Sequence, residues 1–195
     1  VVDDGSTDGT KDAARSVPGV APVVLVHVPN QGLGVTMRTG IEYVLARAGE
    51  DDLLVSMDAD HTHPPELIPE MVARVDDGAD LVIASRFAPG GEVIGLSLFR
   101  RFVSVAASWV LRVFFPGAKD YTCGYRCYRV SLLRQGQARL GEAFLNQQGF
   151  SVMVDVLLKL RPDARIDEVG LQLRYDRKQG ASKMRVVQTA WTTLR

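Results

Sequence analysis

Residues 53–86, LLVSMDADHTHPPELIPEMVARVDDGADLVIASR, contain the pattern that decides the fold. Residues 53–60 and 80–86 are short apolar runs with the composition of buried strands. Between them a helix is predicted to begin at Pro64 and Pro65, because proline is favoured in the first turn of a helix. A strand, a helix and a second strand in this order are typical of parallel strands joined by a crossover helix.

The same alternation extends toward the start of the chain. Residues 23–28, VVLVHV, predict another buried strand, and the turn PNQGLG leads into a helix that runs to about Ala48. The chain opens with VVDDGSTDGT, in which two valines close a strand, a turn follows, and residues 11–15 begin a short helix. We therefore expect an α/β fold with a mostly parallel sheet and helices on both of its faces.

The second half of the chain is more varied. It is predicted to contain a glycine-rich loop, a helix, a strand, two more helices, an extended segment and a final helix, at residues 87–95, 97–115, 121–129, 131–140, 149–161, 165–177 and 183–195. No internal repeat or low-complexity linker divides the sequence, so we expect a single domain over residues 1–195.

Composition places the chain among globular proteins. It has 195 residues, is 46% apolar, and its 23 basic and 23 acidic side chains cancel. Zero net charge gives no general reason to expect a nucleic acid partner. Cys123 and Cys127 are too few for a zinc cage, so we expect reduced packing residues, which favours a cytoplasmic protein. The sequence contains no run of about 20 apolar residues, the length needed to cross a bilayer, so any membrane association should be peripheral.

Acidic residues stand where two of the predicted strands end. Asp3 and Asp4 follow the opening valines, and Asp58 and Asp60 close residues 53–60. Because open α/β sheets bind ligands at the carboxyl ends of their strands, these acids are expected on one rim. Two carboxylates at i and i+2 share a face of an extended chain, and a divalent ion such as Mg²⁺ would balance their charge. The alternative for Asp3 and Asp4 is a turn in which aspartate bonds its own backbone.

Several stretches of the chain resemble glycosyltransferase family 2, in its dolichol-phosphate mannose synthase and polyprenyl-phosphate glycosyltransferase branch. In chain order these are VVDDGSTDGT, NQGLG, MDADHTHPPELIPEM, ASRF followed by GG, DYTCGYRCYR and YDRKQGASKMR. The resemblance implies a GT-A fold, a Mg²⁺ or Mn²⁺ site, and inverting transfer of a sugar from a GDP- or UDP-linked donor to a polyprenyl phosphate, dolichyl or undecaprenyl. It also implies a further strand ahead of residue 1, so that residues 1–195 would be an N-terminally incomplete domain of weak or absent activity.

The resemblance also implies which residues form the donor side of the site. Asp3 and Asp4 take the positions that hold the base and ribose, and carboxylates do accept hydrogen bonds from such groups. Asp58 and Asp60 take the D-x-D positions of the family, with Asp60 as the direct metal ligand.

Neighbouring residues have more ordinary roles. Asn30 and Gly32 match the family, yet a glycine turn before a helix is first a folding feature whose free N–H groups could meet a phosphate. Thr62 stands where some relatives have a metal-binding glutamine, so we expect water there. His61 and His63 are expected to position the loop, because a Mg²⁺-type site prefers oxygen ligands.

Basic residues at family positions are implied to contact phosphates. These are Arg86, Arg100 and Arg177, and a planar guanidinium suits that task, although a single arginine is more often a solvated surface residue. Positions near the acceptor are implied at Asp120, Arg126, Asp155, Ser182 and Lys183.

Alternatives remain open at this point. An ion pair between Asp120 and Arg126 would be the simpler structural role for both. If the acceptor were a sugar hydroxyl, as in polysaccharide or glycolipid synthesis, Asp155 or Asp120 should act as the base. A phospho-signalling receiver is the alternative of another class, and it leaves the arginines and the glycine-rich loop unexplained. An inactive fragment that only binds partners is a further alternative.

A membrane surface is the expected partner on the acceptor side. The predicted helix 97–115 has one polar stripe and a wide apolar remainder, which suits either burial or a bilayer interface. With a polyprenyl phosphate as acceptor, we expect this helix to lie against the membrane with Trp109 and Phe114 as anchors. Arg100 would then be available for the second phosphate.

Overall fold

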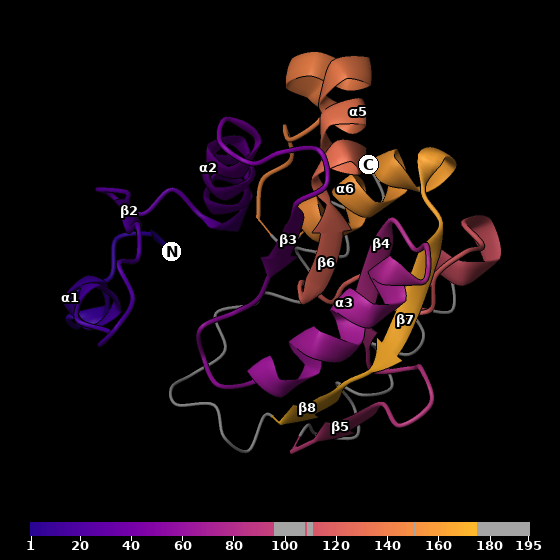
Figure 1. Cartoon of the computed structure of the whole chain (residues 1–195), viewed down its shortest axis with the longest axis horizontal. Helices are drawn as coiled ribbons and strands as arrows, with labels where there is room; N and C mark the ends of the chain where they lie inside the picture. Colours follow the sequence, from indigo (N-terminus) through magenta and orange to yellow (C-terminus); the bar gives the residue numbers. More distant parts are fainter. Residues whose placement is uncertain (96–107, 109–110, 150, 175–195) are drawn as a thin grey trace.

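The computed structural model describes residues 1–95, 108, 111–149 and 151–174 of the chain. Its central layer is a four-stranded sheet surrounded by helices, and an N-terminal unit lies to one side of this sheet. Figure 1 shows the N-terminal unit in indigo and the strands of the sheet in magenta, orange and yellow. The predicted α/β fold class is confirmed.

The N-terminal unit contains two short parallel strands, β1 (Val2–Asp3) and β2 (Leu25–Val26). Between them lies α1 (Thr10–Arg15), and after them comes α2 (Leu33–Leu45). Gly32 precedes α2 with a φ of 87°, a left-handed conformation that glycine adopts without steric cost. The elements therefore follow the order that the sequence predicts.

The central sheet has the strand order β3–β6–β4–β7. These strands are β3 (Leu53–Ser56), β6 (Arg126–Arg129), β4 (Leu81–Ser85) and β7 (Ile166–Gly170). β4 and β7 are parallel, but β6 runs antiparallel to both β3 and β4, unlike the predicted mostly parallel arrangement. Antiparallel neighbours need no crossover helix, so the alternation of strands and helices does not constrain the direction of β6.

Helices shield the sheet from water, and all five residues of β4 are buried. α3 (Ile68–Asp76) follows the short 3₁₀ helix η1 (Pro65–Leu67) and crosses in front of β4 (Figure 1). The predicted helices 131–140 and 149–161 correspond to α5 (Val130–Leu140) and α6 (Ser151–Leu160). Short 3₁₀ helices, η2 (Gly141–Ala143) and η3 (Arg161–Asp163), follow them.

A second small sheet pairs β5 (Glu92–Ile94) with β8 (Gln172–Arg174) in parallel. The sequence predicts only a loop over residues 87–95, because β5 forms by pairing with a strand far along the chain. The described part of the predicted helix 97–115 is helical at residues 111–114. Trp109 and the predicted helix 183–195 lie outside the described residues.

Cys123 and Cys127 are free and buried, as the sequence predicts. Burial raises the pKa of Cys123 to about 12 and that of Cys127 to about 11. Both thiols therefore stay protonated at neutral pH and act as packing groups. Within the described ranges no helix has both the length and the apolar character that crossing a membrane requires.

Two glycines of α2 provide a test of how tightly this helix is packed. A Cβ at Gly34 would overlap the carbonyl oxygen of Gln147 and lie 2.8 Å from Cα of Gln148, whereas one at Gly40 would meet only a Val2 methyl at 3.4 Å. We predict that Gly34→Ala lowers the free energy of unfolding by about 1–3 kcal/mol. Gly40→Ala, the control in the same helix, should leave it unchanged or raise it by up to about 1 kcal/mol. Urea unfolding followed by circular dichroism measures both, and equal effects would contradict the packing.

Candidate active site

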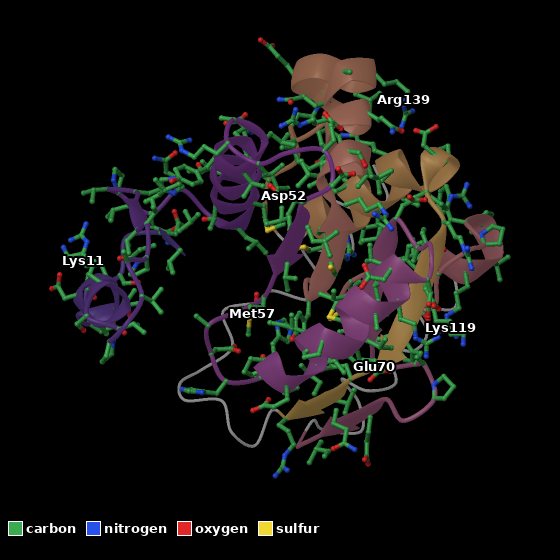
Figure 2. The ribbon with its side chains drawn as sticks, in the orientation of Figure 1. Lys11, Asp52, Met57, Glu70, Lys119 and Arg139 are labelled. Atoms are coloured by element: carbon green, nitrogen blue, oxygen red, sulfur yellow. The ribbon has the colours of Figure 1, made fainter. Side chains whose placement is uncertain are left out.

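Three strand ends meet at one edge of the central sheet. The carboxyl ends of β3 and β4 lie there, and β6 begins there because it runs in the opposite direction, with Arg126 opposite both Ser56 and Ile83. Figure 2 shows Asp52 and Met57 at opposite ends of β3, with Met57 at this edge. The edge therefore brings together residues 57–63, Arg86 and the segment 119–126, which we call the acidic loop after Asp120.

The D-x-D segment is a loop tied to its own neighbours. The Asp60 carboxylate accepts hydrogen bonds from the Thr62 backbone N–H at 3.2 Å and from the Thr62 hydroxyl at 2.5 Å. Asp58 donates its backbone N–H to Nδ1 of His63 at 2.9 Å. Thr62 and His63 are buried, whereas the Asp58 side chain is exposed. His63 therefore has the positioning role that the sequence predicts, and the Thr62 hydroxyl serves Asp60.

Tyr125 of the acidic loop supports the same segment. Its ring stacks on His63 with 5.0 Å between the ring centroids, and its hydroxyl donates to the Pro64 carbonyl at 2.8 Å. Burial raises the pKa of Tyr125 to about 12, so the hydroxyl keeps its proton and remains a donor. Tyr125 was not among the predicted site residues, since an aromatic residue in an apolar strand gives no signal of such a contact.

The residues present fit a hard divalent ion. In the described part of the chain no three His, Cys, Asp or Glu side chains are grouped so as to hold a metal. Mg²⁺ and related ions commonly take only one or two protein carboxylates and complete their shell with water and substrate phosphates. Asp58 and Asp60 would supply such oxygens, whereas Nδ1 of His63 is engaged with the Asp58 backbone.

Arg86 and Asp120 form a buried ion pair at the end of β4. Arg86 Nε and Nη2 each lie 2.7 Å from a different Asp120 oxygen, and the Arg86 backbone N–H adds a third bond at 3.1 Å. The Asp120 side chain is fully buried and that of Arg86 is 9% exposed. Burial alone would raise the pKa of Asp120, but the charge and hydrogen bonds of Arg86 outweigh it, and the pKa is lowered.

The alternative pairing of Asp120 with Arg126 is therefore wrong. Arg126 is fully buried and donates to the carbonyls of Met153 at 2.7 Å and Tyr121 at 2.8 Å. Its Nε has no hydrogen-bond partner among the described residues. Arg126 thus ties the acidic loop to α6. Because its side chain is fully buried, a ligand has no access to it.

Asp155, predicted near the acceptor, forms an ion pair with Lys159 on the same helix, α6. Its carboxylate lies 2.5 Å from Nζ of Lys159, which also donates to the Asn146 side chain at 3.1 Å and to the carbonyl of Ala143. These contacts hold η2 and the loop after it against α6. Asp155 is thus already paired with a cation.

The two acids at the end of β1 are held differently. Asp4 accepts hydrogen bonds from the backbone N–H of Gln31 at 2.9 Å and of Gly32 at 2.7 Å, and from His27 Nδ1 at 2.8 Å. Burial would raise the pKa of Asp4, but these bonds lower it. Asp3 is buried; Ser6 bonds to it and lowers its pKa, yet its Oδ2 has no partner among the described residues.

Turn contacts complete this corner. Asn30 donates its side-chain amide to the Asp4 carbonyl at 2.6 Å, so Asn30 and Gly32 both bind Asp4. Their folding role is therefore present in the structure. Arg100, Arg177, Ser182 and Lys183 lie outside the described residues, so their predicted roles stay predictions.

Glu168 is a further residue of the site that sequence reasoning missed. It lies on β7, and its Oε1 accepts the backbone N–H groups of Lys119 at 2.6 Å and Asp120 at 2.9 Å. This contact ties the acidic loop to β7, in addition to its tie to the end of β4 through Arg86. An acid inside an extended segment was the available signal, but its partners are distant in sequence.

Comparison with known proteins gives a consistent family. The model of the family described as "Glycosyl transferase family 2" matches residues 1–136. Undecaprenyl-phosphate mannosyltransferase of Micrococcus luteus is 36% identical over 188 residues, covering 94% of this chain and 74% of the relative. Polyprenol monophosphomannose synthase of Mycolicibacterium smegmatis is 34% identical over 190 residues, covering 94% and 69%.

The fold matches solved structures as well. Glucosyl-3-phosphoglycerate synthase from Mycobacterium tuberculosis, crystallised with Mn²⁺ and UDP-glucose, superposes with a TM-score of 0.65 at 20% identity. All of this chain is covered, and it spans 65% of the length of that protein. At this identity the likeness is one of fold, and it agrees with the predicted GT-A architecture.

The buried ion pair gives a test by substitution. We predict that Asp120→Asn lowers the free energy of unfolding at pH 7 by about 3–5 kcal/mol, because Arg86 is left buried without its counter-ion. The folded-state pKa of Asp120 is lowered from 3.8, so the stabilising charge is present above that pH and is lost as pH falls toward the folded-state pKa. The difference between wild type and variant should therefore shrink below about pH 4.

Denaturant unfolding between pH 3 and pH 7 measures this effect. The control is Glu50→Gln, which breaks the exposed pair of Glu50 with Arg134 at 3.0 Å and should cost about 0–1 kcal/mol. An Asp120→Asn effect as small as that of the control would mean that the pair is not needed for the fold.

Proposed function

The chain belongs to glycosyl transferase family 2, and on this premise we propose that it moves a sugar from a nucleoside diphosphate sugar to a polyprenyl phosphate. The carrying observation is the tethered Asp58–Asp60 loop at the edge where β3, β4 and β6 meet. Two relatives named for mannose transfer to undecaprenyl or polyprenol phosphate support mannose as the sugar. Membership of the family removes the receiver-like alternative.

The proposed donor site extends from β1 to β3. Asp58 and Asp60 would hold a Mg²⁺ or Mn²⁺ ion, which when bound neutralises charge that develops on the departing diphosphate. Asp3 and Asp4 would lie beside the nucleoside, because carboxylates accept hydrogen bonds from base N–H groups and ribose hydroxyls. His63 and Tyr125 hold the loop in place before the donor arrives, which reduces the ordering that binding requires.

The ion pairs of Asp120 and Asp155 favour a phosphate acceptor over a hydroxyl acceptor. A hydroxyl acceptor needs a base, and the two predicted candidates are Asp120 and Asp155. Asp120 is buried and paired with Arg86, and Asp155 is paired with Lys159, so neither is well placed to accept a proton. A phosphate monoester has a second pKa of about 6 and is already largely ionised at neutral pH. It can attack without a base.

A surface near Arg112 supports approach to a lipid bilayer. Phe114 is 72% exposed and Val113 57% exposed, and both lie in or beside the short helical stretch at residues 111–114. Arg112 is fixed there by its bonds to the Lys119 carbonyl at 2.8 and 2.9 Å. We propose that these apolar side chains contact the membrane interface, where an acceptor with a long prenyl chain would reside.

The metal assignment predicts a loss of donor binding. Asp60→Asn should weaken Mn²⁺-dependent binding of GDP-mannose or UDP-glucose by about tenfold or more, because one ligand of the ion loses its charge. Asp51→Asn, at the opposite end of β3 and exposed, is the matched control. Isothermal titration with and without Mn²⁺ measures both, and unchanged binding by Asp60→Asn would contradict the assignment.

Acceptor preference tests the proposed function itself. With the preferred nucleotide sugar and Mn²⁺ or Mg²⁺, the chain should transfer the radiolabelled sugar to a short polyprenyl phosphate and not to the matching polyprenol. Preference for the alcohol or for a sugar would establish a hydroxyl acceptor instead. Binding of the donor without any transfer would indicate a fragment that only binds.

A further inference from the structure

We propose that His27 is a positioning residue of the donor site, acting through Asp4 on the turn at residues 30–32. The inference rests on the proposed function, in which the end of β1 receives the nucleotide. His27 follows β2 and is buried, with 9% of its surface exposed. Its backbone N–H donates to the Asp3 carbonyl at 2.9 Å, so the residue is fixed beside both acids.

The ring of His27 links the end of β1 to α2. Nδ1 lies 2.8 Å from Oδ1 of Asp4, and Nε2 lies 3.0 Å from the hydroxyl of Thr39 on α2. An ionised carboxylate only accepts hydrogen bonds, so Nδ1 carries a proton. The Thr39 hydroxyl can donate to Nε2 or accept from it, so either way Thr39, His27 and Asp4 form a continuous chain of hydrogen bonds.

This chain of hydrogen bonds sets where the Asp4 carboxylate lies. Its two oxygens then receive the backbone N–H of Gln31 and that of Gly32, at 2.9 and 2.7 Å. With His27 these make three donors for one side chain that is only 17% exposed. These three bonds tie Asp4 to the protein and fix the turn that precedes α2.

The two acids of the opening motif have different surroundings. Asp3 is 3% exposed and has a buried oxygen without a donor among the described residues, whereas Asp4 receives three donors, from Gln31, Gly32 and His27. Sequence reasoning assigned both acids to the nucleotide. The geometry assigns to Asp4, with His27 and Thr39, the support of the turn at residues 30–32.

A near-isosteric pair of variants separates hydrogen bonding from packing. Asn and Leu have similar shapes, but only the Asn amide can still donate to Asp4 from near the position of Nδ1. We expect His27→Leu to raise the donor KM and Kd about tenfold, the size associated with one hydrogen bond to a charged group, with kcat at saturating donor nearly unchanged. His27→Asn should recover most of this loss.

Thr39 supplies a second, independent pair. Thr39→Val keeps the shape and removes the hydroxyl, so it should weaken donor binding by less than His27→Leu does. Thr39→Ser keeps the hydroxyl and should bind as the wild type does. Circular dichroism and thermal unfolding establish that each variant is folded at the assay temperature.

Amide hydrogen exchange without ligand gives a readout that does not depend on the donor. In His27→Leu the Gln31 and Gly32 amides should exchange faster, while the amides of Val82 and Ile83 in β4 keep their protection. Equal donor binding by wild type and His27→Leu, equal loss in His27→Asn and His27→Leu, or unchanged exchange at Gln31 and Gly32 would each overturn the inference. If the wild type binds no nucleotide sugar, the proposed function fails, and the exchange rates still decide the role of His27.

Discussion

The buried charge of Asp120 is the constraint on which the active-site edge depends. A carboxylate with no exposed surface is stable only if donors surround it, and here the guanidinium of Arg86 and the backbone N–H groups of Thr122 and Cys123 do so. Arg86 follows β4, and Glu168 on β7 bonds the backbone of Asp120 itself. The Asp120 carboxylate therefore fixes the end of β4 to the acidic loop, and the Glu168 carboxylate fixes β7 to the same loop.

The acidic loop also contacts the other parts of the active-site edge. The Ser56 hydroxyl, at the end of β3, donates to the Gly124 carbonyl at 2.7 Å, and Tyr125 supports the D-x-D segment through His63. A Cβ at Gly124 would lie 3.1 Å from the Met153 methyl, so this position is tightly packed against α6. The loop is thus in contact with each strand end at the edge and with the helix behind it.

The sequence predicts those parts of this arrangement that depend on residues close together in the chain. The unit from β3 to β4 follows from local periodicity, and the positions of Asp58 and Asp60 follow from it. The direction of β6 and the partner of Asp120 depend on contacts between segments, and Arg86 precedes Asp120 by 34 positions. Local patterns contain no information on such pairs. His27 did leave a signal, a polar residue within the apolar run VVLVHV, whose meaning becomes clear only beside Asp4 and Thr39.

The pairing of Arg86 with Asp120 also changes how the edge attracts anions. Arg86 alone would make the edge more positive. Because Asp120 lies 2.7 Å away, the two charges cancel at long range. An approaching phosphate would sense oriented N–H dipoles at short distance and little long-range field from this pair. Because mobile ions screen long-range fields and hardly affect contacts inside a buried pair, the contribution of Arg86 to encounter rates should be nearly independent of ionic strength. Other cations would then attract a charged substrate toward the site. Arg86 would act only on a bound substrate, by orienting it through hydrogen bonds.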